Sequence, residues 1–130
     1  MYRERMETLK EWKVSKNRKP LIIRGARQVG KTWLMKEFGK LYYEKCAYIN
    51  FDNNSRMDIL FNEEFDLDRI IQGLKIESGI NIEPENTLII FDEIQETPKA
   101  LKTLKYFYEN ANEYHIVAAG SLLGVAMHQG

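Results

Sequence analysis

One stretch of eight residues limits what this chain can fold into more than any other part of it: Gly25-Ala26-Arg27-Gln28-Val29-Gly30-Lys31-Thr32. It fits a pattern of glycine, four free positions, glycine, lysine and then serine or threonine, with every fixed position filled. Its glycines permit positive φ angles and close approach of the backbone. A turn rich in N–H groups that opens onto a helix N-terminus attracts phosphate. The stretch therefore predicts a phosphate-binding loop between a strand and a helix.

The segments on either side of the loop predict the elements that such a loop needs. Pro20-Leu21-Ile22-Ile23-Arg24 is a short apolar run after a proline, which is typical of a buried parallel strand. The segment after the loop predicts a helix, with no helix breaker before Gly39 and apolar residues at near-helical spacing: Trp33, Leu34, Phe38 and Leu41. A glycine turn that stood beside a lysine by coincidence would not be expected to have both a strand before it and a helix after it.

The loop residues have different expected tasks. Lys31 would reach the β- and γ-phosphates and assist catalysis, and the Thr32 hydroxyl would ligate Mg²⁺. The residues expected to bind a nucleotide are the whole loop and the residue after it: Gly25, Ala26, Arg27, Gln28, Val29, Gly30, Lys31, Thr32 and Trp33. Arg27 could neutralise phosphate charge or pair with Asp52 or Glu93, and a plain surface role fits it equally well.

A second motif follows a continuous apolar run over residues 87–91, which predicts another buried strand. This run leads directly into Asp92 and Glu93. A carboxylate at the end of a strand beside the phosphate loop can hold Mg²⁺ through the metal's water shell. The next carboxylate can act as general base on the attacking water. The sequence therefore predicts Asp92 as a metal ligand and Glu93 as the catalytic base, against the alternative of a strand that ends in a polar turn.

Two further residues, Gln95 and Ser121, have two interpretations each, and a third, His115, has one favoured interpretation. Gln95 could contact the γ-phosphate region, although capping of the helix that begins near Pro98 is slightly favoured. Ser121 follows Gly120 where a polar residue could sense the γ-phosphate, and a small residue in a Gly-Ser turn explains it equally well. His115 is expected to be a packing residue at the start of a strand.

Strands and helices alternate along the chain, which predicts an α/β fold: a parallel sheet sandwiched by helices. The expected elements are a short amphipathic helix over 2–14, strands at 47–51, 87–91 and 114–119, and helices near 56–62, 66–78 and 98–110. The chain is expected to be one partial domain over 1–130, with its nucleotide-binding core at 20–123.

Composition excludes several classes of function. The 130 residues carry 19 basic and 19 acidic side chains and hence no net charge, so nothing supports nucleic-acid binding. The single Cys46 allows no internal disulfide and fits a reducing compartment. No apolar stretch reaches the length of a membrane span, and the first residues do not form a signal peptide. A cytoplasmic protein is the expectation.

Four segments together resemble the AAA-type P-loop ATPases of bacteria and archaea: Ile23 to Thr32, Tyr48 to Asp52, Phe91 to Gln95, and Ala118 to Ser121. More narrowly, they resemble a branch in which the ATPase module precedes a C-terminal domain of unknown function. The resemblance covers almost all of residues 1–130 and implies ATP and Mg²⁺ as ligands. It also implies phosphate contacts from Gly25 to Thr32, Asp92 for the metal, Glu93 as base and Ser121 at the sensor position.

The resemblance also implies parts that lie beyond Gly130: a fifth core strand, further arginine-bearing elements and the C-terminal domain. The family's sheet has the order 5-1-4-3-2, in which the strand over 20–24 pairs with the fifth strand. Without that strand it would be an exposed apolar edge, prone to pairing. The expectation is a truncated product, or an edge that another chain covers, with self-association as a consequence.

The leading functional hypothesis is Mg²⁺-dependent ATP binding and hydrolysis. A P-loop kinase shares the loop, but Asp92-Glu93 directly after the strand favours hydrolysis, and no arginine-rich lid is visible. A nucleotide-gated switch or scaffold that binds tightly and hydrolyses little is the third possibility. A measurement of turnover against nucleotide affinity would separate the hydrolase from the switch.

Overall fold

The computed structural model of the chain describes residues 2–25 and 29–121. Its centre is a parallel sheet of four strands in the order β1-β4-β3-β2. The strands are β1 (Leu21–Gly25), β2 (Lys45–Asn50), β3 (Thr87–Asp92) and β4 (His115–Ser121). The predicted α/β fold is therefore confirmed, and β4 lies between the two strands that carry the sequence motifs, as expected.

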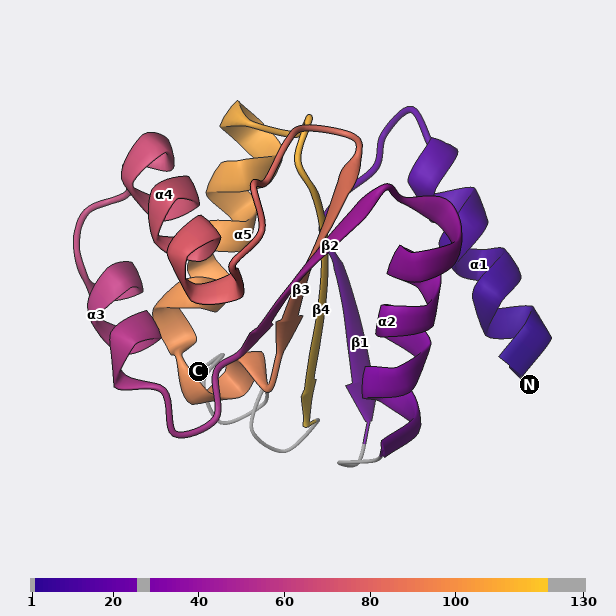
Figure 1. Cartoon of the computed structure of the whole chain (residues 1–130), viewed down its shortest axis with the longest axis horizontal. Helices are drawn as coiled ribbons and strands as arrows, with labels where there is room; N and C mark the ends of the chain where they lie inside the picture. The colour runs from indigo at the N-terminus through magenta and orange to yellow at the C-terminus, as the bar shows by residue number, and fades with distance from the viewer. Residues whose placement is uncertain (1, 26–28, 122–130) are drawn as a thin grey trace.

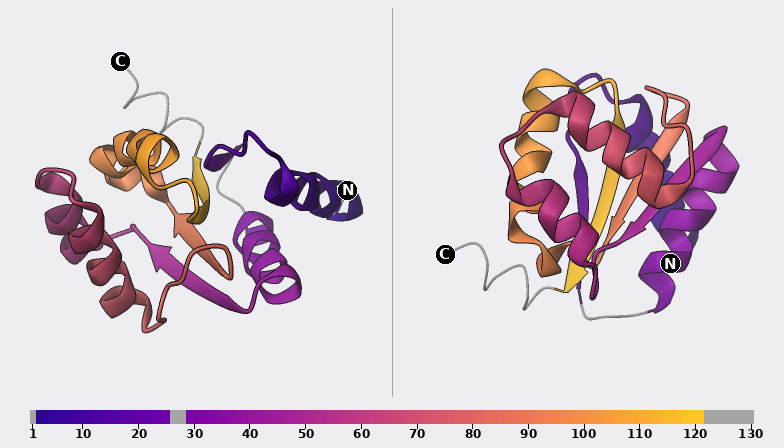
Figure 2. Two further views of the ribbon diagram at one scale, coloured as in Figure 1. Left: turned by 90° about the horizontal axis from the view of Figure 1, so that it is seen from above. Right: turned by 60° about the vertical axis from the view of Figure 1, so that its left-hand side comes forward.

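Helices cover both faces of this sheet (Figures 1 and 2). One face carries α1 (Tyr2–Val14) and α2 (Val29–Tyr42). The other carries α3 (Ser55–Asn62), α4 (Leu67–Ser78) and α5 (Pro98–Asn110), and a short 3-10 helix, η1 (Ile94–Glu96), joins β3 to α5. The result is a three-layer α/β/α arrangement.

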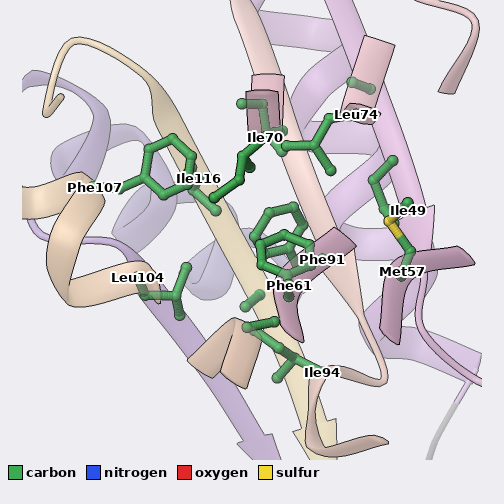
Figure 3. Close-up of a cluster of buried hydrophobic side chains, with 14 of the residues drawn as sticks. Ile49, Met57, Phe61, Ile70, Leu74, Phe91, Ile94, Leu104, Phe107 and Ile116 are labelled. Atoms are coloured by element: carbon green, nitrogen blue, oxygen red, sulfur yellow. The ribbon is translucent and has the colours of Figure 1, made fainter. Parts of the chain in front are cut away.

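Strand β3 is buried on both faces, as expected for the apolar run over 87–91. Its side chains alternate between two cores: Leu88 and Ile90 pack under α1 and α2, whereas Ile89 and Phe91 pack under α3, α4 and α5. Figure 3 shows the second core, in which Phe61 of α3 lies against Phe91 with the ring centroids 5.9 Å apart.

Local signals define helix α4. Asp66 caps its N-terminus by accepting a hydrogen bond from the backbone N–H of Arg69 at 3.3 Å. The helix ends at Gly79, whose φ of 73° is the left-handed conformation that suits glycine at a helix C-terminus.

The predicted apolar face of α2 is partly wrong. Leu34 and Phe38 are buried as expected, but Trp33 is 50% exposed and Leu41 is 52% exposed. Met35 is fully buried, because the helix turns the 34, 35 and 38 positions toward the sheet. The helix also continues through Gly39 to Tyr42.

Because all four strands are parallel, their carboxyl ends meet at one edge of the sheet. Gly25 is in register with Ser121, and Asn50 is in register with Asp92. Helix α2 begins at this same edge, since it follows β1 through the loop. Ligands of open α/β sheets bind outside the carboxyl ends of the strands, and both motifs of the sequence lie there.

Candidate functional site

The first turn of α2 brings Lys31 over the sheet. Its side chain is buried, with 7% exposure, and its ammonium donates to the backbone carbonyl of Gly120 in β4 at 3.4 Å. This contact joins residues 89 positions apart in the sequence, across the β1–β4 pair. A cation is thus held at the carboxyl edge, beside the N-terminus of a helix.

The carboxylate of Asp92 is the meeting point of three elements. Its Oδ2 accepts a hydrogen bond from the Thr32 hydroxyl of α2 at 2.6 Å and another from the Tyr48 hydroxyl of β2 at 2.7 Å. Its Oδ1 accepts from the backbone N–H of Glu93 at 3.0 Å. The Asp92 side chain is only 5% exposed, so these donors fix its orientation in a largely buried setting.

Tyr48 is the residue of this cluster that the sequence analysis did not single out. Burial, together with the neighbouring Asp92, raises the pKa of the Tyr48 phenol above its ordinary range, so the hydroxyl keeps its proton. The Lys36 ammonium lies 4.0 Å from the centroid of the Tyr48 ring. A hydroxyl-bearing aromatic residue within the predicted strand over 47–51 was the available signal, but the pairing of β2 with β3 was needed to interpret it.

Glu93 has an unusual backbone. Its φ of 56° and ψ of 43° lie in the left-handed region, which is uncommon for residues other than glycine. The side-chain amide of Gln95 donates to Glu93 Oε1 at 2.8 Å and approaches Glu96 Oε2 at 3.4 Å. The turn after β3 thus directs Glu93 away from a regular strand continuation.

The favoured interpretation of Gln95 as a helix cap is wrong. Gln95 is buried within η1, and the N-cap position of α5 belongs to Thr97. The Thr97 hydroxyl does not cap the helix either, because it donates to Asp58 Oδ1 of α3 at 2.7 Å. Pro98 at the first position of α5 has no N–H that would need a cap.

Several predicted site residues cannot be judged from the described part of the chain. Ala26, Arg27 and Gln28 lie outside it, and with them the proposed pairing of Arg27. Ser121 ends β4 with its backbone in register with Gly25, but its side chain is not described. Trp33, half exposed, follows Thr32 on α2.

The oxygen donors at this edge suit a hard divalent cation such as Mg²⁺. Within residues 2–25 and 29–121, no three His, Cys, Asp or Glu side chains gather into a metal-binding group. A hydroxyl and one carboxylate converge instead, at Thr32 and Asp92. Mg²⁺ prefers oxygen ligands and commonly takes one or two carboxylates, with water and substrate phosphates completing its shell. The residues therefore suit a magnesium ion that arrives with a phosphate ligand.

A parallel sheet with β4 between the two motif strands, and with the start of α2 beside Asp92, is a P-loop NTPase core. The family comparison agrees: a model described as an AAA domain matches residues 17–130. The chain belongs to this family, which implies a module that binds nucleoside triphosphates. A comparison with curated proteins gives no match. None of the helices in the described ranges is long and apolar enough to cross a membrane.

Proposed function

We propose that this chain binds ATP together with Mg²⁺ and hydrolyses it. The observation that carries the proposal is the 2.6 Å hydrogen bond between Thr32 Oγ1 and Asp92 Oδ2. It joins two motifs that are 60 residues apart in the sequence, each of which separately predicts a part of a nucleotide site. If the end of β3 and the glycine loop served only the fold, a hydrogen bond between the Thr32 hydroxyl and the Asp92 carboxylate would not be expected.

The phosphates would lie on the loop from Gly25 to Thr32, at the N-terminus of α2. Lys31 is suited to the β- and γ-phosphates because its ammonium is already buried at this edge. Its contact to the Gly120 carbonyl is long, at 3.4 Å. A charged phosphate oxygen makes a shorter and stronger hydrogen bond than a neutral carbonyl, so nucleotide would draw Lys31 from Gly120.

Thr32 and Asp92 are the residues that would hold the metal. When bound, Mg²⁺ would neutralise charge on the phosphate oxygens. Asp92 is suited to this task because its orientation is fixed by hydrogen bonds to both carboxylate oxygens. Glu93 would act as general base by accepting a proton from the attacking water. We further propose Ser121 as the sensor of the γ-phosphate, since β4 ends beside the loop.

Replacement of Lys31 by alanine tests the proposal. We expect Lys31→Ala to weaken Mg-ATP binding by roughly tenfold or more, about 1.4 kcal/mol, because the variant loses a cation on the phosphates. The measurement is isothermal calorimetry, with circular dichroism to verify the fold. Lys40→Ala, an exposed lysine on the same helix, is the control. Equal affinity of Lys31→Ala and the parent would rule out the assignment.

A switch with little turnover is the second candidate, and one observation favours it. The Gln95 amide occupies Glu93 Oε1 at 2.8 Å, which competes with water for the proposed base. Steady-state phosphate release measured beside ATP affinity decides between the two. Tight binding with no release would favour the switch.

We also propose that the chain self-associates through the β1 edge. Among the described residues, β1 pairs with β4 alone. An apolar groove lies on each side of it, one of about 220 Å³ beside Leu21 and Ile23 and one of about 420 Å³ beside Ile22. Light scattering over a range of protein concentrations tests this. A monodisperse monomer at all concentrations would exclude it.

A further inference from the structure

Two hydroxyls from different elements, Thr32 of α2 and Tyr48 of β2, converge on one oxygen of Asp92. Thr32 belongs to the phosphate motif and would be required by the metal. Tyr48 belongs to neither sequence motif, yet its hydroxyl lies 2.7 Å from the same Oδ2. Strand register explains the contact, because β2 and β3 pair with Tyr48 opposite Ile90, two positions before the pair of Asn50 and Asp92.

The hydroxyl of Tyr48 is not explained by packing alone, because it donates a hydrogen bond to the Asp92 carboxylate. Phenylalanine would pack equally well under α2, whereas a partly buried hydroxyl costs about 1–3 kcal/mol when its partner is missing. In this structure the partner is a carboxylate, and hydrogen bonds to charged groups are the stronger kind. Lys36, on the turn of α2 after Thr32, adds a cation 4.0 Å from the ring centroid. A cation over the ring withdraws electron density from the phenol and so favours donation by its hydroxyl.

We propose that Tyr48, assisted by Lys36, is a positioning residue for the metal site: its hydroxyl holds Asp92 in the orientation that Mg²⁺ requires. The inference rests on the proposed Mg²⁺-dependent nucleotide binding. Thr32 cannot hold Asp92 alone, since its oxygen would also serve the metal. Tyr48 has no such second task. It acts from a strand that carries neither motif, and it therefore links the metal site to β2.

The consequence separates two kinds of binding. Without the Tyr48 hydroxyl, Asp92 keeps the Glu93 N–H on Oδ1, but its Oδ2 depends on the Thr32 hydroxyl alone, which the metal also needs. Asp92 is then less firmly oriented, which weakens metal binding and leaves the phosphate loop unaltered. Tyr48→Phe is the test, because it removes a single oxygen and keeps the ring under Lys36. We expect the Mg²⁺ concentration for half-maximal enhancement of ATP binding to rise about tenfold, the lower end of what loss of an outer-shell partner costs a metal site. Binding of ATP in EDTA should stay equal to that of the parent.

Tyr42→Phe is the matched control. Tyr42 is the last residue of α2 and likewise has a lysine, Lys10 of α1, over its ring at 5.5 Å, but it stands at the far end of α2 from Asp92. We expect its Mg²⁺ midpoint to equal that of the parent. Calorimetric titration of Mg²⁺ at fixed ATP, with thermal melting of each variant, measures both the metal dependence and the fold.

The outcomes distinguish the inference from the function on which it rests. If ATP binding by the parent does not respond to Mg²⁺, the proposed metal function fails, and the positioning role fails with it. If the parent responds and Tyr48→Phe has the same Mg²⁺ midpoint, only the positioning role is overturned. A lower melting temperature with an unchanged midpoint would assign Tyr48 a structural task and also overturn it.

Lys36→Met provides a second, independent variant. It keeps the phenol and the length of the side chain but removes the cation above the ring. We expect a shift of the Mg²⁺ midpoint in the same direction as in Tyr48→Phe and smaller than it. Should Tyr48→Phe fail to fold, an unchanged midpoint in Lys36→Met would overturn the proposal, and a raised one would support it.

Discussion

Glu93 combines a strained backbone with a side chain that has a chemical task in the proposed mechanism. A left-handed φ of 56° costs a residue with a Cβ atom about 1–2 kcal/mol. Glycine would remove this cost, yet the position carries glutamate. Strained residues of this kind gather at functional sites, where the surrounding structure holds them in place. The backbone of Glu93 fits the role proposed for its carboxylate, while Asn53 and Glu85 share the left-handed conformation without an assigned role.

Two substitutions at Glu93 distinguish the proposed proton acceptance by its carboxylate from the energetic cost of its left-handed backbone. Glu93→Gln should bind Mg-ATP like the parent and lose hydrolysis, because the amide cannot accept the proton. Glu93→Gly should also lose hydrolysis, but it should unfold at a higher temperature, since glycine adopts the left-handed backbone freely. Phosphate release and thermal melting are the measurements. Hydrolysis by Glu93→Gln at the parental rate would show that another group is the base.

At Asp92, charge and orientation can be distinguished. Asp92→Asn keeps the shape of the side chain and an oxygen for the Thr32 and Tyr48 hydroxyls, but it removes the negative charge. We expect ATP binding to lose most of its Mg²⁺ dependence, because a hard cation is held chiefly by charged oxygen ligands. Titration of Mg²⁺ at fixed ATP checks this. The same Mg²⁺ dependence in parent and variant would place the metal elsewhere.

The sequence could predict the residues whose motif is local. Lys31, Thr32 and Asp92 each follow from a few neighbouring residues, and the structure brings all three to one edge of the sheet. Tyr48 could not be predicted, because its contact with Asp92 depends on which strands pair and in what register. Gln95 was misassigned for a related reason: its partners lie in a turn whose backbone the sequence does not specify.

At the scale of elements, the sequence predicted each strand and each α-helix of the described part, but it missed the short 3-10 helix η1 and how closely the elements approach one another. Helix α2 and strand β2 are the clearest example. Gly39 was interpreted as a possible helix breaker, but α2 continues through it. At Gly39, which has no side chain, the helix lies close to Cys46 of β2. A Cβ atom built on Gly39 would lie 2.8 Å from Cys46 Sγ and 3.3 Å from Leu88 Cδ2. The glycine serves packing rather than termination.

Gly39→Ala should therefore destabilise the protein in spite of alanine's higher helix propensity. Propensity alone would favour alanine by about 1 kcal/mol. Overpacking of a tight core costs typically 1–3 kcal/mol, and here the backbone of α2 or the Cys46 side chain has to move. Urea unfolding measures the balance, with Lys40→Ala on the exposed side of α2 as control. A more stable Gly39→Ala would show that this helix can shift freely.

At the scale of the whole molecule, a cluster of Trp12, Tyr43 and His115 joins α1, the residue that follows α2, and β4. His115, at the start of β4, is 6% exposed, and its Nδ1 lies 2.6 Å from the Tyr43 hydroxyl. The Trp12 ring of α1 packs edge-on at 5.9 Å between ring centroids. The expectation that His115 is a packing residue is confirmed. Because Trp12 and Tyr43 lie on either side of β1 in the sequence, this cluster connects segments far apart in the chain.

The charge state of His115 makes stability depend on pH. Burial, and then the cations of Arg18 and Lys13, lower the pKa of His115 from 6.5 to about 4. Burial also raises the pKa of Tyr43 above its ordinary range, so its hydroxyl stays protonated and can donate to a neutral imidazole. The folded protein therefore disfavours a proton on His115 that the unfolded chain accepts below its ordinary pKa.

The contribution of neutral His115 to the free energy of unfolding should thus be fully present above pH 6.5 and should decrease as the pH drops from 6.5 toward 4. Over this window we expect the protonation of His115 to lower the free energy of unfolding by an amount on the order of 2–3 kcal/mol.

His115→Asn tests this, because it keeps an acceptor for the Tyr43 hydroxyl and removes the titrating group. Carboxylates titrate alike in both proteins, so the difference between parent and variant in urea unfolding, measured from pH 7 to pH 4, isolates His115. The difference in the free energy of unfolding between the parent and His115→Asn should decrease steadily as the pH falls. If the two proteins lose stability in parallel, the fold tolerates protonated His115, and the cluster has no effect on how stability depends on pH.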